Sequence, residues 1–135
     1  MSIDVTAEVT IDRDPEAVWE FMTDPQHEPE WIGGLKTSHL QGEPPLRVGS
    51  RVERVASFLG KKIEYVNEVT ELDPPRKLDM RSVVAPFPMH ITYTLDGGQR
   101  TVVRNHVRGG GMRLMAPFVR RNIQRDLERL RDLLT

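Results

Sequence analysis

The chain has 135 residues and a mass of 15.5 kDa, with 19 lysine and arginine residues against 20 aspartate and glutamate residues and no cysteine. This length fits one domain that buries about two-thirds of its unfolded surface, and the absence of cysteine excludes a disulfide framework, thiolate zinc sites and thiol catalysis. No apolar run approaches the roughly 18 residues that span a bilayer, and the N-terminal segment has no signal-peptide core. We therefore expect residues 1–135 to form a single cytoplasmic domain without stable membrane insertion.

The net charge of −1 hides an uneven distribution of charge along the chain. Residues 1–45 contain 10 acidic and 2 basic residues, a net charge of −8, whereas residues 46–135 contain 10 acidic and 17 basic residues, a net charge of +7. The near-zero total argues against a general polyanion binder. The two opposite halves predict either screening within one molecule or a homodimer whose formation depends on salt.

The N-terminal segment predicts a strand followed by two short helices. Apolar residues at every second position from Ile3 to Ile11 indicate a strand with one buried face. Asp14, Pro15 and Glu16 supply an N-cap acid, a proline at the first helical position and a further acid in the first turn. That helix is expected to stop near residues 24–25, and a further turn or two over residues 26–31 precedes two glycines.

The remaining residues predict a run of strands and then one long helix. The expected strands cover residues 35–40, 50–58, 61–72, 76–83, 87–95 and 99–108. After three glycines, apolar residues recur every three or four positions from Met112 to Leu134, which indicates an amphipathic helix that Pro117 either kinks or starts. This order is typical of an α+β fold in which the long helix covers one face of an antiparallel sheet. We expect function in the space between them.

The segment Asp96-Gly97-Gly98 is the strongest hairpin signal in the predicted sheet. A three-residue turn here keeps apolar side chains on one face, whereas a two- or four-residue turn would bring basic side chains to that face. The favoured register pairs Tyr93 with Thr101, Ile91 with Val103 and Met89 with Asn105. It predicts an exposed basic row of Arg104, His106 and Arg108, and it turns Asn105 inward, where its amide needs hydrogen-bond partners.

Seven short segments carry a family resemblance across nearly the whole chain. They are IDRDPEAVW (11–19), TDP (23–25), PEW (29–31), VGSR (48–51), VTELDPPRKL (69–78), GGQRTVV (97–103) and APFVRR (116–121). In this order they resemble the START-like (SRPBCC) superfamily of polyketide cyclase/dehydrase and lipid-transport proteins. The resemblance implies the helix-grip fold, in which a curved antiparallel sheet wraps around a long C-terminal helix and a hydrophobic cavity. It does not select an activity, because members include binders, carriers and cyclases.

The side chains expected to line such a cavity are mainly aromatic and apolar, with a few polar groups, as in other small-molecule sites. They are Trp31, Phe58, Tyr65, Met80, Met89, Tyr93, Asn105, Met115, Phe118 and Val119. The alternative is that these side chains simply fill the core. The leading hypothesis is that the chain binds a small hydrophobic, lipid-like or polyketide-like molecule without a cofactor.

Two other functional hypotheses remain open. In a polyketide cyclase or dehydratase, Tyr65, Tyr93 and Asn105 could orient a ligand carbonyl and move a proton, although no motif identifies a catalytic residue. In an interaction module, Phe118 and the basic row would contact a partner or a second copy of the chain.

Several other kinds of site are disfavoured by residue spacing. None of the four histidines (His27, His39, His90 and His106) has a partner at the helical or strand spacing of metal ligands. The chain has no G-x-S-x-G elbow, no P-loop and no G-x-G-x-x-G segment. Acidic residues interrupt the arginines of the last helix, and no aromatic set for base stacking accompanies them. We therefore predict no metal, no cofactor and no nucleic-acid partner.

Overall fold

The computed structural model describes residues 3–58, 60–86, 88–111 and 113–135, and of Phe58 it describes the backbone only. Within these ranges, seven strands form one antiparallel sheet in the order β1-β7-β6-β5-β4-β3-β2. The strands are β1 Ile3–Ile11, β2 Leu35–Gln41, β3 Arg51–Phe58, β4 Lys61–Asp73, β5 Lys77–Val84, β6 Met89–Gly97 and β7 Thr101–Gly109. The helices are α1 Pro15–Met22, α2 Glu28–Trp31 and α3 Ala116–Leu134, with the 3-10 turn η1 Arg113–Met115 before α3.

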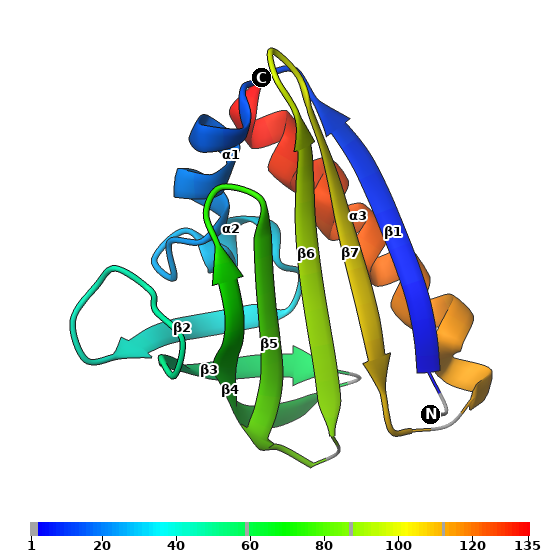
Figure 1. The fold of residues 1–135 in the computed structure, drawn as a ribbon. Helices are drawn as coiled ribbons and strands as arrows, with labels where there is room; N and C mark the ends of the chain where they lie inside the picture. The colour runs from blue at the N-terminus through cyan, green and yellow to red at the C-terminus, as the bar shows by residue number, and fades with distance from the viewer. Residues whose placement is uncertain (1–2, 59, 87, 112) are drawn as a thin grey trace.

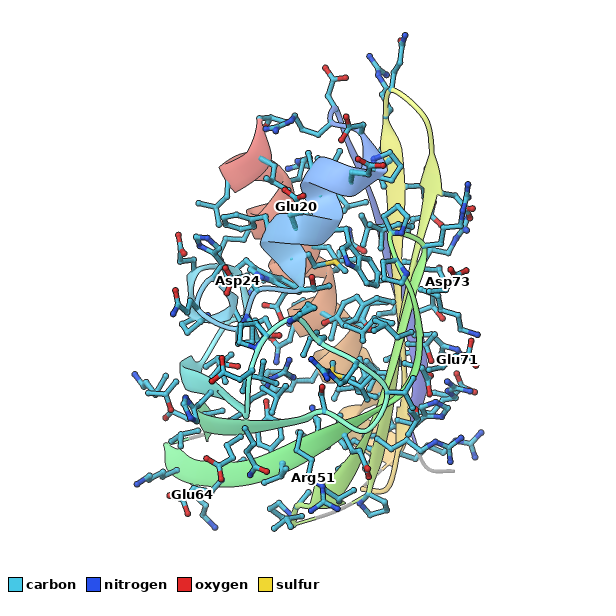
Figure 2. The ribbon with its side chains drawn as sticks, turned by 60° about the vertical axis from the view of Figure 1, so that its left-hand side comes forward. Glu20, Asp24, Arg51, Glu64, Glu71 and Asp73 are labelled. Carbon is cyan, nitrogen blue, oxygen red and sulfur yellow. The ribbon has the colours of Figure 1, made fainter. Side chains whose placement is uncertain are left out.

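The sheet curves around the long C-terminal helix, as the resemblance implied. Figure 1 shows α3 crossing behind β6, β7 and β1, while β2 and β3 run almost at right angles to these strands. In Figure 2, Glu71 and Asp73 lie on the side of the sheet that faces away from α1 and α3. The helices therefore cover one face of the sheet only, and the predicted α+β helix-grip fold is confirmed.

Local signals at the N-terminus act as the sequence predicted. Side chains of β1 alternate between buried and exposed over its whole length. The Asp14 carboxylate accepts a hydrogen bond of 2.8 Å from the Ala17 amide, and Pro15 occupies the first turn of α1. The cap supplies a partner for one of the amides that a helix start leaves without one, and the proline has no amide to satisfy.

Helix α3 begins at Ala116, so Pro117 lies in its first turn and marks its start rather than a kink. Its apolar stripe is buried deepest towards the C-terminal end, at Leu127, Leu130 and Leu134. Among the described residues, no helix is both long and apolar enough to cross a membrane.

The hairpin between β6 and β7 differs in register from the prediction. Leu95 lies opposite Val103 and Tyr93 lies opposite Asn105, and the turn is formed by residues 98–100. The alternation of apolar and polar side chains excludes a shift by an odd number of residues, because such a shift would turn each side chain to the other face. The observed register differs from the predicted one by four residues, so every side chain keeps its face. The inward placement of Asn105 is therefore correct, but its neighbour across the strands is Tyr93 rather than Met89.

The basic row on β7 points outward as predicted, but only Arg104 is fully exposed. Its Nε atom lies 2.5 Å from a carboxylate oxygen of Glu8, and His106 Nε2 lies 2.6 Å from Asp4 Oδ1. His106 and Arg108 are half-buried. This part of the prediction is wrong because side chains of both neighbouring strands cover the row: Asp4 of β1 lies beside His106, and Thr92 of β6 accepts a hydrogen bond from Arg108.

Candidate ligand-binding cavity

A cavity of about 380 Å³ lies between the inner face of the sheet and the first half of α3. The strands contribute through alternation, which turns Ile63, Tyr65 and Asn67 of β4 to the same face. The helix contributes Met115, at its N-cap, and Val119 one turn later, as the three-to-four residue spacing of one helix face requires.

Three consecutive glycines, Gly109 to Gly111, line one end of the cavity. A Cβ atom on Gly109 would lie 2.7 Å from the Pro88 carbonyl oxygen, and the Gly110 amide donates a 2.9 Å hydrogen bond to the same oxygen. The β7–α3 connection therefore packs directly on the β5–β6 connection, and Figure 1 shows both at one end of the sheet. Pro86 and Gly111 line the cavity and are also exposed, so the cavity reaches the surface between these connections. We call this opening the mouth.

Four of the predicted side chains line the cavity: Tyr65, Met89, Met115 and Val119. Four others, Trp31, Met80, Tyr93 and Asn105, are buried but do not line it. Phe118 is half-buried on α3 and does not line it either. The side chain of Phe58 lies outside the described part of the structure.

Two of the buried residues that do not line the cavity, Trp31 and Tyr93, lie in the part of the core that side chains fill completely. The rings of Trp31 and Tyr93 meet edge to face at 6.1 Å. Trp31 and Tyr93 pack in one cluster with Val18 of α1 and with Leu127 and Leu130 of α3. The short helices and the C-terminal half of α3 fill that end, which leaves the cavity at the other.

Most lining residues that the sequence did not single out are small, or are aliphatic residues without a distinctive motif. They are Ile3, Gly33, Ala56, Ile63, Asn67, Ser82, Ala85, Pro86, Ile91, Val107, Gly109, Gly110, Gly111, Asn122 and Ile123. Strand alternation from Tyr65 would have found Ile63 and Asn67, and the helix stripe would have found Ile123. No sequence pattern identifies the glycines and alanines, because they contribute to the cavity by leaving volume unfilled and not by a recognisable side chain.

A buried polar cluster borders the cavity at β3. The guanidinium of Arg54 forms an ion pair with Glu28, which also accepts a hydrogen bond from Ser38. Burial alone would lower the pKa of Arg54, but the charge of Glu28 and the nearby Tyr65 and Tyr93 raise it above its ordinary value. Arg54 lies opposite Tyr65 in the sheet, so a permanent positive charge lies beside Tyr65 on the inner face of the sheet.

Two buried donors in this region have no hydrogen-bond partner among the described residues: Arg54 Nε and Asn67 Nδ2. Asn67 also lines the cavity. Buried donors without partners cost stability, so this corner is the part of the site best suited to a ligand oxygen.

The chemistry available inside the cavity is limited. Among the described lining residues, Tyr65 is the only ionisable side chain. Burial raises the pKa of Tyr93 above its usual range, so its hydroxyl stays protonated at neutral pH. No three His, Asp or Glu side chains in the described ranges are grouped closely enough to hold a metal ion.

The fold is shared with solved proteins from bacteria and plants. A protein from Thermus thermophilus is 20% identical with a TM-score of 0.80, and the alignment covers 97% of this chain and 96% of that one. An aromatase/cyclase from Streptomyces sp. R1128 is 17% identical with a TM-score of 0.77, over 97% of this chain and 92% of that one. Ginseng major latex-like protein 151 from Panax ginseng is 15% identical with a TM-score of 0.78, over 97% and 96% of the two chains. At these identities the likeness establishes the fold alone.

The sequence comparison identifies the family. No curated protein matches the chain in sequence. The family model described as polyketide cyclase/dehydrase and lipid transport matches residues 2–135, which is almost the whole chain. The protein therefore belongs to the polyketide cyclase/dehydrase and lipid-transport family.

Proposed function

We propose that the protein binds a small hydrophobic molecule in the cavity between the sheet and α3. The observation that carries this proposal is the cavity itself, whose volume of about 380 Å³ falls in the usual range of small-molecule sites, ~300–1,000 Å³. Its walls are mainly aliphatic, and Met89 and Met115 can adapt to ligands of different shape. The polar groups of Tyr65 and Asn67 would orient an oxygen atom of the ligand.

Filling the cavity tests this proposal. We expect Ala56→Phe and Val119→Trp to lower the affinity for an amphipathic fluorescent probe with apolar aromatic rings, anilinonaphthalene sulfonate, by at least tenfold, about 1.4 kcal/mol, because the added rings occupy the ligand volume. Fluorescence titration measures the affinity, and native mass spectrometry of the same variants detects hydrophobic ligands retained from the expression host.

The matched control is Val48→Phe, which adds a ring at an exposed position outside the cavity. It should bind the probe as the unmodified protein does. If both filled variants keep circular dichroism spectra and probe affinity unchanged, the cavity is not the binding site.

A cyclase or dehydratase is the second candidate, supported by the position of Tyr65 in the cavity wall opposite Arg54. The positive charge would favour negative charge developing on a ligand oxygen near the tyrosine. Simple binding is favoured because general acid–base chemistry needs titratable groups that pass a proton on, and Tyr65 is the only ionisable side chain among the described lining residues. If Tyr65→Phe abolishes turnover of an aromatic polyketide while leaving its binding intact, the enzyme assignment replaces simple binding.

A further inference from the structure

The mouth of the cavity carries exposed apolar side chains. Leu114 of η1 is 84% exposed, and Val84 at the end of β5 is 60% exposed. Both are close in sequence to residues that form the mouth, Leu114 next to Met115 and Val84 next to Ala85. Single exposed apolar residues are common on protein surfaces, so Leu114 and Val84 alone do not indicate an interaction site.

The second observation is a one-sided distribution of charge. Residues 97–125 contain seven arginines and no acidic residue. Arg100 forms an ion pair with Asp12, Arg104 forms one with Glu8, and Arg108 donates a hydrogen bond to Thr92. The other four have no ion-pair partner in the described part of the chain and are exposed: Arg113, Arg120, Arg121 and Arg125.

These arginines and Leu114 lie along one side of η1 and the first half of α3. Positions 113, 114, 117, 120, 121 and 125 are all exposed. Steps of three or four residues connect them, from 114 to 117 to 120 and from 113 to 117 to 121 to 125, which places them along one side of the helix. We call this strip the cationic ridge. It begins at the mouth and joins an apolar tip to a row of unpaired positive charges.

We propose that the cationic ridge and the mouth dock on a lipid bilayer that contains anionic headgroups. Arginines beside exposed leucine suit the headgroup region, where cations meet lipid phosphates and a short apolar side chain reaches the acyl boundary. A stable protein partner would require a continuous complementary surface of roughly 800 Å² on this side, whereas Val84 ends β5 and Leu114 lies in η1, on opposite sides of the mouth.

Docking in this orientation would place the mouth against the medium in which hydrophobic molecules dissolve. The purpose of docking, to collect or release the cavity's ligand, rests on the proposed function. The docking itself rests only on the ridge and can be tested separately.

Vesicle flotation at about 0.1 M NaCl tests the proposal. We expect the protein to bind vesicles of phosphatidylcholine with about one-quarter phosphatidylglycerol, and to bind vesicles of phosphatidylcholine alone weakly or not at all. Arg120→Glu combined with Arg121→Glu should lower the affinity at least roughly twentyfold, since each arginine near an anionic surface contributes about fivefold. Leu114→Ser should lower it as well, because the apolar tip is lost.

Matched controls lie at the other end of the molecule. Arg100→Glu combined with Arg131→Glu changes the net charge by the same amount as the ridge pair, and Leu133→Ser removes an exposed leucine near the C-terminus. Both controls should retain vesicle binding. No binding to the anionic vesicles, or equal loss in ridge and control variants, would overturn the proposal, as would binding to an acidic protein in the absence of any binding to vesicles.

The cavity-filling variant Ala56→Phe separates this inference from the proposed function. It should bind vesicles normally, because Ala56 does not belong to the ridge. If vesicles bind but no hydrophobic probe enters the unmodified protein, the proposed function fails and the docking surface stands. If probes bind and vesicles do not, the docking surface fails alone.

Discussion

Gly97, at the end of β6, occupies a backbone conformation that favours glycine. Its φ is 144°, and a Cβ atom would lie 1.8 Å from the Arg100 carbonyl oxygen. We expect Gly97→Ala to lower the free energy of unfolding by about 2 kcal/mol or more, because the β6–β7 turn must move to admit the methyl group. Urea denaturation measures the change.

The neighbouring glycine provides the control for this substitution. A Cβ atom on Gly98 would meet no atom within 4 Å, and its φ is not in the left-handed region. Gly98→Ala should therefore change stability by less than about 0.5 kcal/mol. Equal effects at the two positions would contradict the strain assigned to Gly97.

The pair of Glu28 and Arg54 makes a residue-level prediction inside the core. Both side chains are buried, and Arg54 is only 4% exposed. Removing one partner of a buried ion pair leaves the other charge uncompensated. We expect Glu28→Gln to destabilise the protein by about 3–5 kcal/mol in urea denaturation. Glu30→Gln, on an exposed position of the same short helix, should cost less than about 1 kcal/mol; a similarly small loss at Glu28 would show that Arg54 does not depend on it.

The outer face of the sheet is tied together by polar contacts from one strand. Asp79 of β5 accepts hydrogen bonds from Thr70 of β4 at 2.5 Å and from Thr92 of β6 at 2.5 Å, and His90 Nε2 lies 2.6 Å from the same carboxylate. Burial alone would raise the pKa of Asp79, but these donors outweigh it and lower the pKa below its ordinary value. Three neighbouring strands therefore share one carboxylate on the face that no helix covers.

Secondary-structure elements with a regular pattern could be predicted from the sequence, and their fine pairing could not. The strict alternation of β1 and the apolar stripe of α3 follow directly from the residues that each element must bury. The β6–β7 register could not be predicted, because alternation gives the same faces for any shift of the same parity. Gly97 fits the observed register, in which it takes a φ of 144° just before the turn, but the sequence does not show which glycine of the turn takes such a φ.

For the candidate site too, the sequence pattern predicted which side chains face inward but not which of them line the cavity. Tyr65, Met89, Met115 and Val119 were predictable because they combine an inward position with a suitable side chain. Trp31 and Tyr93 share those properties yet pack in the core, because α1, α2 and the end of α3 fill that half of the fold. A sequence pattern specifies which way a side chain points, whereas a cavity depends on which elements fail to fill the space.

Charge is distributed over the whole molecule in a way that the linear sequence only partly indicated. The acidic residues of β1 lie next to basic residues of β7, as in the pairs Glu8–Arg104 and Asp4–His106. Part of the opposition between the two halves of the chain is thus screened within one molecule. Four arginines without an ion-pair partner lie on the cationic ridge, and other exposed basic residues of the described chain, such as Lys36, Arg47 and Arg81, also have none. Salt-dependent dimerisation stays a prediction, with less unpaired charge to drive it.

Stability of the whole fold should depend on pH through Asp126 of α3. Burial raises the pKa of Asp126 from 3.8 to about 6, although the Gly33 amide donates a 2.9 Å hydrogen bond to its carboxylate and Arg129 lies 3.4 Å away. The folded protein then binds more protons than the unfolded chain between pH 3.8 and about 6, so the free energy of unfolding falls as pH rises through this window. The loss contributed by this group amounts to about 3 kcal/mol by neutral pH.

Asp126→Asn should remove this pH dependence, because an amide oxygen can still accept the Gly33 hydrogen bond without carrying charge. We expect the variant to match the unmodified protein near pH 4 and to exceed its stability by up to about 3 kcal/mol at neutral pH. Urea denaturation at several pH values measures the difference between the two proteins, which cancels the titration of all other groups. Asp132→Asn, at an exposed position of the same helix, is the control for the substitution itself and should keep the loss of stability between pH 4 and neutral pH. A variant at Asp126 that becomes less stable than the unmodified protein as pH rises would show that Arg129 outweighs burial at this site.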